Sequence, residues 1–279
     1  MKIAKTKTEL HNYLSLLKTG NVKLGLVPTM GALHNGHISL VNQSKSKCDF
    51  TVVSIFVNPT QFNNVNDLLK YPKPIEQDIK MLEEAGCDLL FHPDADEIYS
   101  TNEVWNYEVG ELDSLLEGEF RPGHYQGVTQ IVFKLFDLIK PQFAFFGQKD
   151  YQQFLVIQKM NLDLGLGIKL EACPIIREAD GLAMSSRNSR LNADERKTAL
   201  VIYQSLIFLK NNFDKFPLNQ LLAKAKELYA CENLLKLEYL KICDIQTLTE
   251  VKEKNNEVCI VLIACFVGET RLIDNMILS

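Results

Sequence analysis

The sequence predicts an α/β protein, in which a doubly wound parallel sheet is followed by a smaller α+β domain. Short apolar runs alternate with amphipathic stretches over the first two thirds of the 279 residues. One run, 51–57, is apolar or β-branched at nearly every position, which is typical of a parallel strand covered on both faces. Near Ile176 this alternation stops, so we expect a first domain at 1–176 and a second at 177–279.

The elements expected in the first domain follow one another in strand–helix order. Strands are expected at 22–27, 51–57, 87–91, 143–146 and 169–173, and helices at 38–47, around 75–82, at 128–139 and at 151–164. Gly86 stands where the second helix needs its C-cap, and Pro141 ends the third. Because crossovers between parallel strands are right-handed, this order predicts a doubly wound sheet.

The second domain follows a polar segment with little periodicity, 176–192, in which Asp180 and Gly181 predict a turn. Asn192 and Glu195 predict an N-cap with its capping-box partner. They open a helix from 193 to about 213, and a second helix is expected at 218–229, with strands at 237–243 and 257–266. The apolar run 258–267 is too short to span a bilayer and is interpreted as a central strand.

Composition excludes several classes of protein. The hydrophobic content of 46% and the charged content of 23% are those of a soluble globular protein. A net charge of −5 disfavours broad nucleic-acid binding but allows a local cluster that binds a small anion. The seven cysteines form no Cys-x-x-Cys pair and mostly lie in apolar runs, which predicts reduced, buried thiols in a cytoplasmic protein without a zinc site. The N-terminus does not resemble a signal peptide.

The most informative segment, 27–37, joins an expected strand to an expected helix. It contains two glycines, Gly31 and Gly36, and two histidines, His34 and His37. A strand, a glycine turn and a first helical turn direct backbone N–H groups and the positive helix end at one point, which suits a phosphate. Two imidazoles there add donors for charge that develops on phosphate oxygens. In isolation, a plain turn with solvated histidines is the alternative.

Polar clusters after the other strands are candidates too, because ligands of doubly wound sheets bind beyond the carboxyl ends of the strands. Asn58 and Gln61 follow the expected strand at 51–57. Their amide groups suit a small polar ligand, or the segment forms an ordinary loop. The cluster 119–127, with Arg121 and His124, suits anion recognition, or forms a surface turn.

Two later clusters suit a nucleotide. Gly147 lets backbone approach a ligand closely, and Lys149 can neutralise phosphate. Asp150 can hold Mg²⁺ directly or through water, or cap the helix that follows. The segment 183–190, with its hydroxyl and guanidinium groups, suits a loop that closes over a polyphosphate, or a flexible linker.

Seven motifs, in their order along the chain, carry a resemblance to a known family. They are Pro28-Thr29-Met30-Gly31-Ala32-Leu33-His34-x-Gly36-His37, Phe56-Val57-Asn58-Pro59-x-Gln61-Phe62, Leu116-Glu117-Gly118, Arg121-Pro122-Gly123-His124, Gly147-x-Lys149-Asp150 with Gln152-Gln153, Asp180-Gly181-Leu182-Ala183-Met184-Ser185-Ser186-Arg187-Asn188, and Arg271-Leu272-Ile273-Asp274-Asn275. The chain resembles the pantothenate synthetase (pantoate–β-alanine ligase) family, within the nucleotidyltransferases related to class I aminoacyl-tRNA synthetases. Lys73 stands where the family usually has arginine, which puts any two-donor contact there in doubt.

The resemblance implies a Rossmann-like domain, a C-terminal lid domain and a two-step reaction. The carboxylate of pantoate attacks the α-phosphorus of ATP and gives pantoyl adenylate and pyrophosphate. The amine of β-alanine then attacks the acyl carbon, which gives pantothenate and AMP. The resemblance also implies Mg²⁺ and a cytoplasmic homodimer that binds neither nucleic acid nor membrane.

The resemblance assigns residues to each part of this reaction. The implied catalytic residues are His37, His34 and Lys149. The implied ATP-binding residues are Met30, Gly31, Ala32, Leu33, His34, Asn35, Gly36, His37, Gly147, Gln148, Lys149, Asp150, Ile176, Met184, Ser185, Ser186 and Arg187. Gln61, Gln153 and Asn58 are implied to bind pantoate or β-alanine, and Asp150 to hold Mg²⁺.

Two other functions compete with this assignment. One is another nucleotidyltransferase of the superfamily, a cytidylyl- or adenylyltransferase that acts on a phosphate. The motifs around Asn58 and Lys149 favour the ligase over it. The other is a nucleotide-binding regulator without catalysis, which we would expect to have lost a histidine, Lys149 or a glutamine, and all of these are present.

Overall fold

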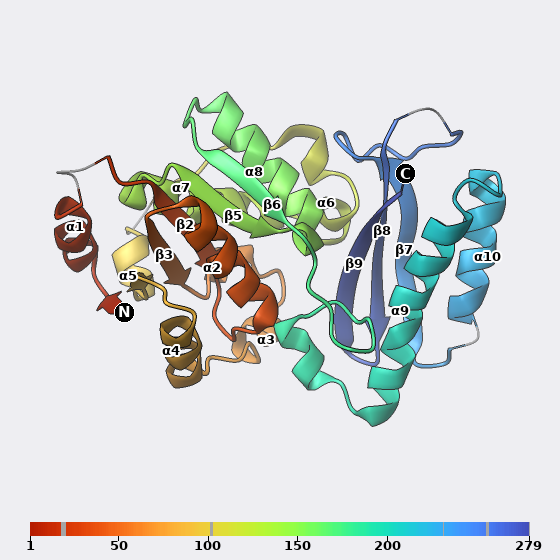
Figure 1. Ribbon diagram of the computed structural model, residues 1–279. Helices are drawn as coiled ribbons and strands as arrows, with labels where there is room; N and C mark the ends of the chain where they lie inside the picture. Colours follow the sequence, from red (N-terminus) through yellow and green to blue (C-terminus); the bar gives the residue numbers. More distant parts are fainter. Residues whose placement is uncertain (18–20, 101–102, 231, 255–256, 279) are drawn as a thin grey trace. The chain divides into compact units, whose positions relative to one another are not determined.

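The computed structural model describes residues 1–17, 21–100, 103–230, 232–254 and 257–278 (Figure 1). They form two compact units. The first comprises Met1–Gly147 and Gln152–Pro174, and the second comprises Gln148–Tyr151 and Ile175–Ser279. The expected division has a single boundary near residue 176, whereas the chain enters the second unit twice. A single boundary cannot describe the segment 148–151, which belongs to the second unit although the residues before and after it belong to the first.

The first unit contains a six-stranded sheet in the order β1-β4-β3-β2-β5-β6, with every neighbouring pair parallel (Figure 1). The strands are β1 (Lys2–Ala4), β2 (Leu24–Thr29), β3 (Phe50–Ile55), β4 (Leu89–Phe91), β5 (Phe143–Gly147) and β6 (Lys169–Cys173). Val52 and Val53 point to opposite faces of the sheet and both are fully buried, so both faces are covered. The predicted doubly wound sheet is confirmed, but β1 was missed because three residues carry no readable pattern.

Eight helices are described in this part of the chain. They are α1 (Lys7–Ser15), α2 (Asn35–Lys47), α3 (Val65–Leu69), α4 (Ile75–Glu84), α5 (Ala95–Ile98), α6 (Glu117–Phe120), α7 (His124–Ile139) and α8 (Tyr151–Asp163). Helix α1 was not predicted, although its capping box was readable: Thr6 accepts the N–H of Glu9, whose carboxylate accepts the N–H of Thr6. In the described ranges, no helix has the length and apolar character that a membrane span needs.

Strand β2 is where the strand order reverses. β3 and β4 follow on one side of it, and β5 and β6 lie on the other. The loops that leave β2 and β5 therefore diverge at their carboxyl ends, the place where doubly wound sheets bind their ligands. Thr29 ends β2 and Gly147 ends β5, so the segment that follows Thr29 begins at this switch point.

The second unit has a three-stranded antiparallel sheet in the order β7-β8-β9. Its strands are β7 (Leu235–Asp244), β8 (Cys259–Val267) and β9 (Thr270–Leu278), and its helices are α9 (Ala193–Asn212) and α10 (Leu218–Ala230). Apolar residues of both helices and of β8 form one buried cluster that includes Leu206, Leu221 and Val261. The predicted central strand and the capping box of Asn192 and Glu195 are confirmed. Strand β9 was missed, because Asp274 and Asn275 interrupt its apolar pattern.

The six cysteines in the described ranges are free thiols, and all but Cys48 are buried. Burial raises the pKa of the Cys87 and Cys173 thiols to about 11. It raises the pKa of the Cys243 and Cys265 thiols to about 12. The prediction of buried thiols is confirmed for the cysteines other than Cys48, which is partly exposed, whereas Cys231 lies outside the described residues.

Helix α7 packs closely on the 3₁₀ turn η1 (Pro59–Gln61), and Gly127 makes this approach possible. A Cβ on Gly127 would overlap the carbonyl oxygen of Thr60. We expect Gly127→Ala to lower the free energy of unfolding by at least about 1–3 kcal/mol, because backbone cannot yield as a side chain does. In an uncrowded helix the same change stabilises by up to about 1 kcal/mol.

Gly165→Ala is the matched control, because φ at Gly165 is +60° and no heavy atom lies within 4 Å of the added Cβ. The left-handed conformation alone costs about 1–2 kcal/mol for alanine. Urea unfolding of both variants separates the loss caused by crowding at Gly127 from the loss caused by a left-handed backbone at Gly165. A Gly127→Ala variant as stable as the wild type would contradict the close packing of α7 on η1.

Candidate active site

The turn from β2 into α2 is held by a buried carboxylate. Gly31 and Ala32 both have positive φ, +79° and +49°, and the second of these is strained for a residue with a side chain. Asp78 of α4, 1% exposed, accepts the Ala32 N–H at Oδ2 and the Leu33 N–H at Oδ1, each at 2.8 Å. These two hydrogen bonds satisfy the buried N–H groups and fix the turn.

Asp78 is a residue that sequence reasoning missed. It lies on the same face of α4 as Ile75, Ile79 and Leu82, so a carboxylate on the apolar face of a helix was the available signal. Burial raises the pKa of Asp78, and the two backbone N–H donors act against that rise.

The turn delivers two histidines to the start of α2. His34 is the N-cap, and its Nδ1 accepts the Gly36 N–H at 3.1 Å. The Nδ1 of His37 accepts the His34 N–H at 3.3 Å, so the two rings form a reciprocal capping box. A ring nitrogen that accepts an N–H carries no proton, so in the neutral rings the proton lies on Nε2.

The same two rings are neighbours, with centroids 4.1 Å apart and planes inclined by 38°. The prediction that both imidazoles lie together is therefore confirmed. Their Nε2–H groups are donors at the N-terminus of a 13-residue helix, whose dipole favours negative charge there. This arrangement is suited to an anion such as a phosphate.

Gln61 lies beside this turn. Its Nε2 donates to the Sδ of Met30 at 3.1 Å, which joins the second predicted cluster to the first. Asn58 holds the other end of the amide, because its Nδ2 donates to Gln61 Oε1 at 3.1 Å and to the Gly127 carbonyl at 3.0 Å. The orientation of the Gln61 amide, with its N–H groups away from Asn58, follows from these contacts.

Asn58 is itself fixed by two hydroxyl groups. The Tyr99 hydroxyl donates to Asn58 Oδ1 at 2.6 Å, and the Thr60 hydroxyl donates to the same oxygen at 3.0 Å. Burial raises the pKa of Tyr99 to about 12, so this hydroxyl stays a donor at neutral pH. Asn58 was predicted to bind substrate, but it is 1% exposed and has protein partners at both ends of its amide.

The predicted cluster 119–127 holds the backbone of Gln61. His124, 5% exposed, places Nδ1 2.9 Å from the Gln61 carbonyl oxygen, and Arg121 Nη2 lies 3.5 Å from the same oxygen. A surface turn does not describe His124, which is buried.

The two adjacent glutamines of α8 have different surroundings. Gln152, 2% exposed, donates to the carbonyls of Leu112 and Leu115 at 2.7 and 2.8 Å and accepts the Glu117 N–H at 3.0 Å. Gln153 is partly buried and makes no side-chain hydrogen bond within the described ranges. Gln152 is therefore structural, whereas the role of Gln153 in substrate binding stays a prediction.

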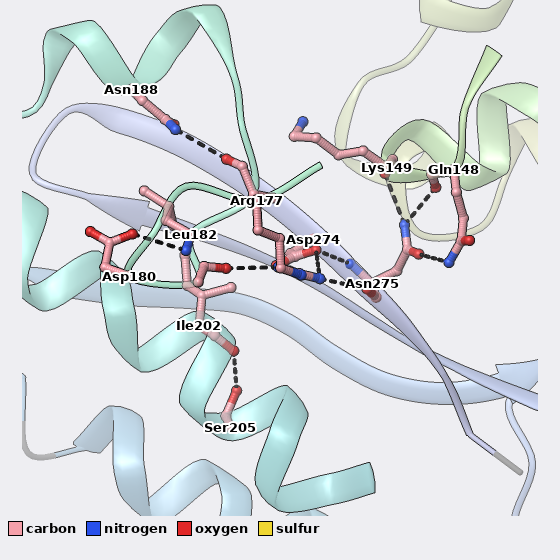
Figure 2. A network of polar contacts seen from close by, with 12 residues as sticks. Gln148, Lys149, Arg177, Asp180, Leu182, Asn188, Ile202, Ser205, Asp274 and Asn275 are labelled. Atoms are coloured by element: carbon pink, nitrogen blue, oxygen red, sulfur yellow. Dashed lines mark hydrogen bonds and ion pairs between the residues drawn. The ribbon is translucent and has the colours of Figure 1, made fainter. Parts of the chain in front are cut away.

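In the second unit, Asn275 of β9 holds the 3₁₀ turn η3 (Gln148–Asp150), as Figure 2 shows. Its Nδ2 donates to the carbonyls of Gln148 and Lys149, each at 2.9 Å, and its Oδ1 accepts the Gln148 side-chain amide at 3.2 Å. The Lys149 side chain extends away from these contacts (Figure 2). Asp150 is exposed, and no three His, Cys, Asp or Glu side chains of the described chain gather as a metal site.

The predicted loop after Ile176 is a short antiparallel turn followed by a 3₁₀ turn. The Met184 N–H donates to the Ile176 carbonyl at 3.0 Å, and the predicted bend at Asp180 lies between them. Ser185 Oγ then accepts the Arg187 N–H at 3.3 Å and opens η4 (Ser186–Arg190). The structure thus brings together the candidate residues from 176 and 184–187. Strand β9 contacts both η3 and η4.

A buried ion pair anchors this loop to β9. Arg177 binds both oxygens of Asp274, at 2.6 and 3.0 Å, and donates to the Gly181 carbonyl at 3.1 Å. The guanidinium carbon lies 4.7 Å from the ring centre of Tyr203. Burial raises the pKa of Asp274, and the adjacent guanidinium works in the opposite direction. This pair joins residues 97 positions apart in the sequence and was not predicted.

Comparison with known proteins decides the family. Residues 2–277 match the family model described as pantoate-beta-alanine ligase. The chain belongs to this family. This ligase is 45% identical over 277 residues to a pantothenate synthetase of Bacteroides fragilis, and the match covers 99% of the chain and 98% of the relative.

Solved structures agree with the family. This ligase is similar to a pantothenate synthetase from Thermus thermophilus, with a TM-score of 0.92, 38% identity and 99% of each chain covered. It is also similar to a pantoate-beta-alanine ligase from Francisella tularensis, described as complexed with beta-gamma ATP and beta-alanine, with a TM-score of 0.83 and 37% identity. That comparison covers 99% of this chain and 97% of the other.

These findings confirm the predicted family, the fold class and the ligation of pantoate to β-alanine. The residue roles stay predictions. Lys73, where the family motif has arginine, is exposed just before α4.

The capping box allows the structural role of His34 as an N-cap to be tested apart from its proposed role in the reaction. His34→Ala removes the cap and should lower the free energy of unfolding by about 0.5–2 kcal/mol. His34→Asn keeps a good N-cap without an imidazole and should cost much less. Urea unfolding measures both, and equal losses would show that the ring does not cap α2.

Proposed function

We propose that this ligase makes pantothenate through a pantoyl adenylate. A carboxylate oxygen of pantoate attacks the α-phosphorus of ATP, and pyrophosphate leaves. The amine nitrogen of β-alanine then attacks the acyl carbon, and AMP leaves with the oxygen that pantoate supplied. The observation that supports this most directly is the pair of imidazoles, 4.1 Å apart, at the N-terminus of α2.

In the first step, His34 and His37 donate Nε2–H groups to phosphate oxygens. Negative charge shifts onto these oxygens as pyrophosphate is displaced from the α-phosphorus, and donors already in place stabilise that charge without reorganisation. The backbone of Met30–His37 contacts the nucleotide next to the two histidines. Gly31 and Gly36, which have no side chain, allow the backbone to approach the nucleotide closely. The roles are positioning and charge stabilisation, so no residue forms a covalent intermediate.

The family resemblance assigns further residues to ATP. Lys149, Ser185, Ser186 and Arg187 are assigned to its phosphates, and Gly147, Gln148, Ile176 and Met184 to the rest of the nucleotide. Mg²⁺ usually keeps waters and binds one or two carboxylates together with substrate phosphates. An exposed single carboxylate such as Asp150 suits that use. When bound, the ion would supply positive charge that offsets the charge of the phosphates.

Pantoate is bound by Gln61 and Gln153. Because Asn58 holds Gln61 Oε1, the Gln61 amide presents N–H donors, which suit an acceptor oxygen of pantoate. Asn58 acts by positioning Gln61, and Gln61 also lies near β-alanine in the second step. An acyl adenylate hydrolyses in water, so we assign the loop 180–190 the task of closing over it.

We also propose that the enzyme is a cytoplasmic homodimer, as its family resemblance implies. Light scattering during size-exclusion chromatography tests the dimer, and a monomer mass would contradict it.

Isotope transfer tests the adenylate route. Pantoate labelled with ¹⁸O in its carboxylate should deliver one labelled oxygen to AMP, and mass spectrometry of AMP reads this directly. ATP and pantoate without β-alanine should release pyrophosphate in a single turnover. AMP without the label would exclude the adenylate, and nucleotide transfer to a phosphate acceptor would favour the rival transferase.

His37→Ala should slow adenylate formation by about 10²–10³-fold, the usual loss when one donor to a developing oxyanion is removed. Pantoate affinity should change little. Single-turnover pyrophosphate release measures the rate, and His11→Ala, which removes an exposed imidazole of α1, is the control. A near-normal rate in His37→Ala would refute the assigned role.

Gln61→Ala should raise the KM for pantoate about tenfold or more, because a hydrogen bond to a charged group contributes about 1.5–3 kcal/mol. The KM for ATP should stay nearly constant. Gln43→Ala removes an exposed amide from α2 and serves as the control. An effect confined to ATP would contradict the assignment.

A further inference from the structure

Asn275 lies in the middle of β9 and is 1% exposed. A buried amide is costly unless its donors and acceptor are satisfied. Within the described residues, all three side-chain hydrogen bonds of Asn275 go to one target, the segment Gln148–Lys149 (Figure 2). This side chain therefore serves a turn that is 126 residues away in sequence.

The two carbonyls that Asn275 binds are those on either side of the Lys149 α-carbon. The Gln148 carbonyl belongs to the peptide plane before Lys149, and the Lys149 carbonyl belongs to the plane after it. Holding both planes, each by a 2.9 Å hydrogen bond, fixes the direction in which the Lys149 side chain leaves the backbone. In Figure 2 that side chain points away from Asn275.

Asn275 is also held at its own backbone. Its N–H donates to Asp274 Oδ1 at 2.8 Å, and its carbonyl oxygen lies 3.4 Å from Arg177 Nη2. Asp274 is 3% exposed and pairs with Arg177 through both carboxylate oxygens. The ion pair thus clamps the peptide on both sides of Asn275, so the amide is a rigid support.

We propose that Asn275 is a positioning residue that directs the ammonium group of Lys149 to a phosphate of ATP. A lysine carries a point charge on a flexible four-carbon stem, so its backbone direction decides where the charge can reach. This inference rests on the proposed phosphate role of Lys149. Asn275 itself touches neither ATP nor pantoate in this scheme.

A double-mutant cycle tests the proposal in the full-length enzyme. Asn275→Ala should slow adenylate formation by about 10- to 100-fold at saturating ATP and pantoate, because misplaced groups lose rate on this scale. Lys149→Ala should slow it at least as much. The double variant should be within about twofold of Lys149→Ala alone, because Asn275 acts only through Lys149. Single-turnover pyrophosphate release is the readout.

Met276→Ala is the matched control for a weakened strand. Met276 is the next residue of β9 and packs against the apolar core of the second unit. Met276→Ala should lower the midpoint of thermal unfolding, while its adenylation rate should stay within about twofold of the wild-type rate. If Asn275→Ala does not fold, Asn275→Ser, which keeps a small polar group, replaces it in the same cycle with the same expected non-additivity.

The outcomes separate this proposal from the function on which it rests. If Lys149→Ala leaves adenylation unchanged, the phosphate role of Lys149 fails, and the positioning role fails with it. If Lys149→Ala slows adenylation but Asn275→Ala has no effect, or the two losses multiply, only the positioning role is overturned. If Met276→Ala slows adenylation as much as Asn275→Ala does, the loss comes from β9 as a whole and the proposal is again overturned.

Discussion

The two hydrogen bonds from the Ala32 and Leu33 N–H groups to Asp78 are the constraint on which the first unit's candidate site depends. The turn places a non-glycine residue at positive φ and buries two N–H groups, each of which would cost about 1–3 kcal/mol without a partner. With that turn fixed, His34 falls at the N-cap of α2 and His37 one helical turn later. The imidazole pair is therefore a consequence of a carboxylate on another helix.

Both units use a buried asparagine to hold a residue of the proposed mechanism. Asn58 binds the side chain of Gln61 and the carbonyl of Gly127, and Asn275 binds two carbonyls next to Lys149. An amide offers two donors and an acceptor without removing a charge from water, so it can be fully buried at modest cost. The groups assigned to contact substrate are thus oriented by neutral side chains that stay covered.

The sequence allowed the sheet, most helices and the region of the site to be predicted, because these follow from local patterns. Apolar runs marked β2, β3 and β5, and glycines after the strands marked the turns. The features that were not predicted depend on contacts between distant segments. Asp78 in α4, the burial of His124 and the pair Arg177–Asp274 each need a partner that no local pattern names. Strand β9 was missed because Asp274 and Asn275, which interrupt its apolar pattern, bind residues that are distant in the sequence.

The raised thiol pKa values have a consequence for how the protein withstands oxidants. A thiol with a pKa of about 11 or 12 is almost entirely protonated at pH 7. Peroxides and other electrophiles react with the thiolate form. Burial and the raised pKa therefore make Cys87, Cys173, Cys243 and Cys265 poorer targets for oxidation than an exposed thiol of ordinary pKa, and they pack as small apolar side chains.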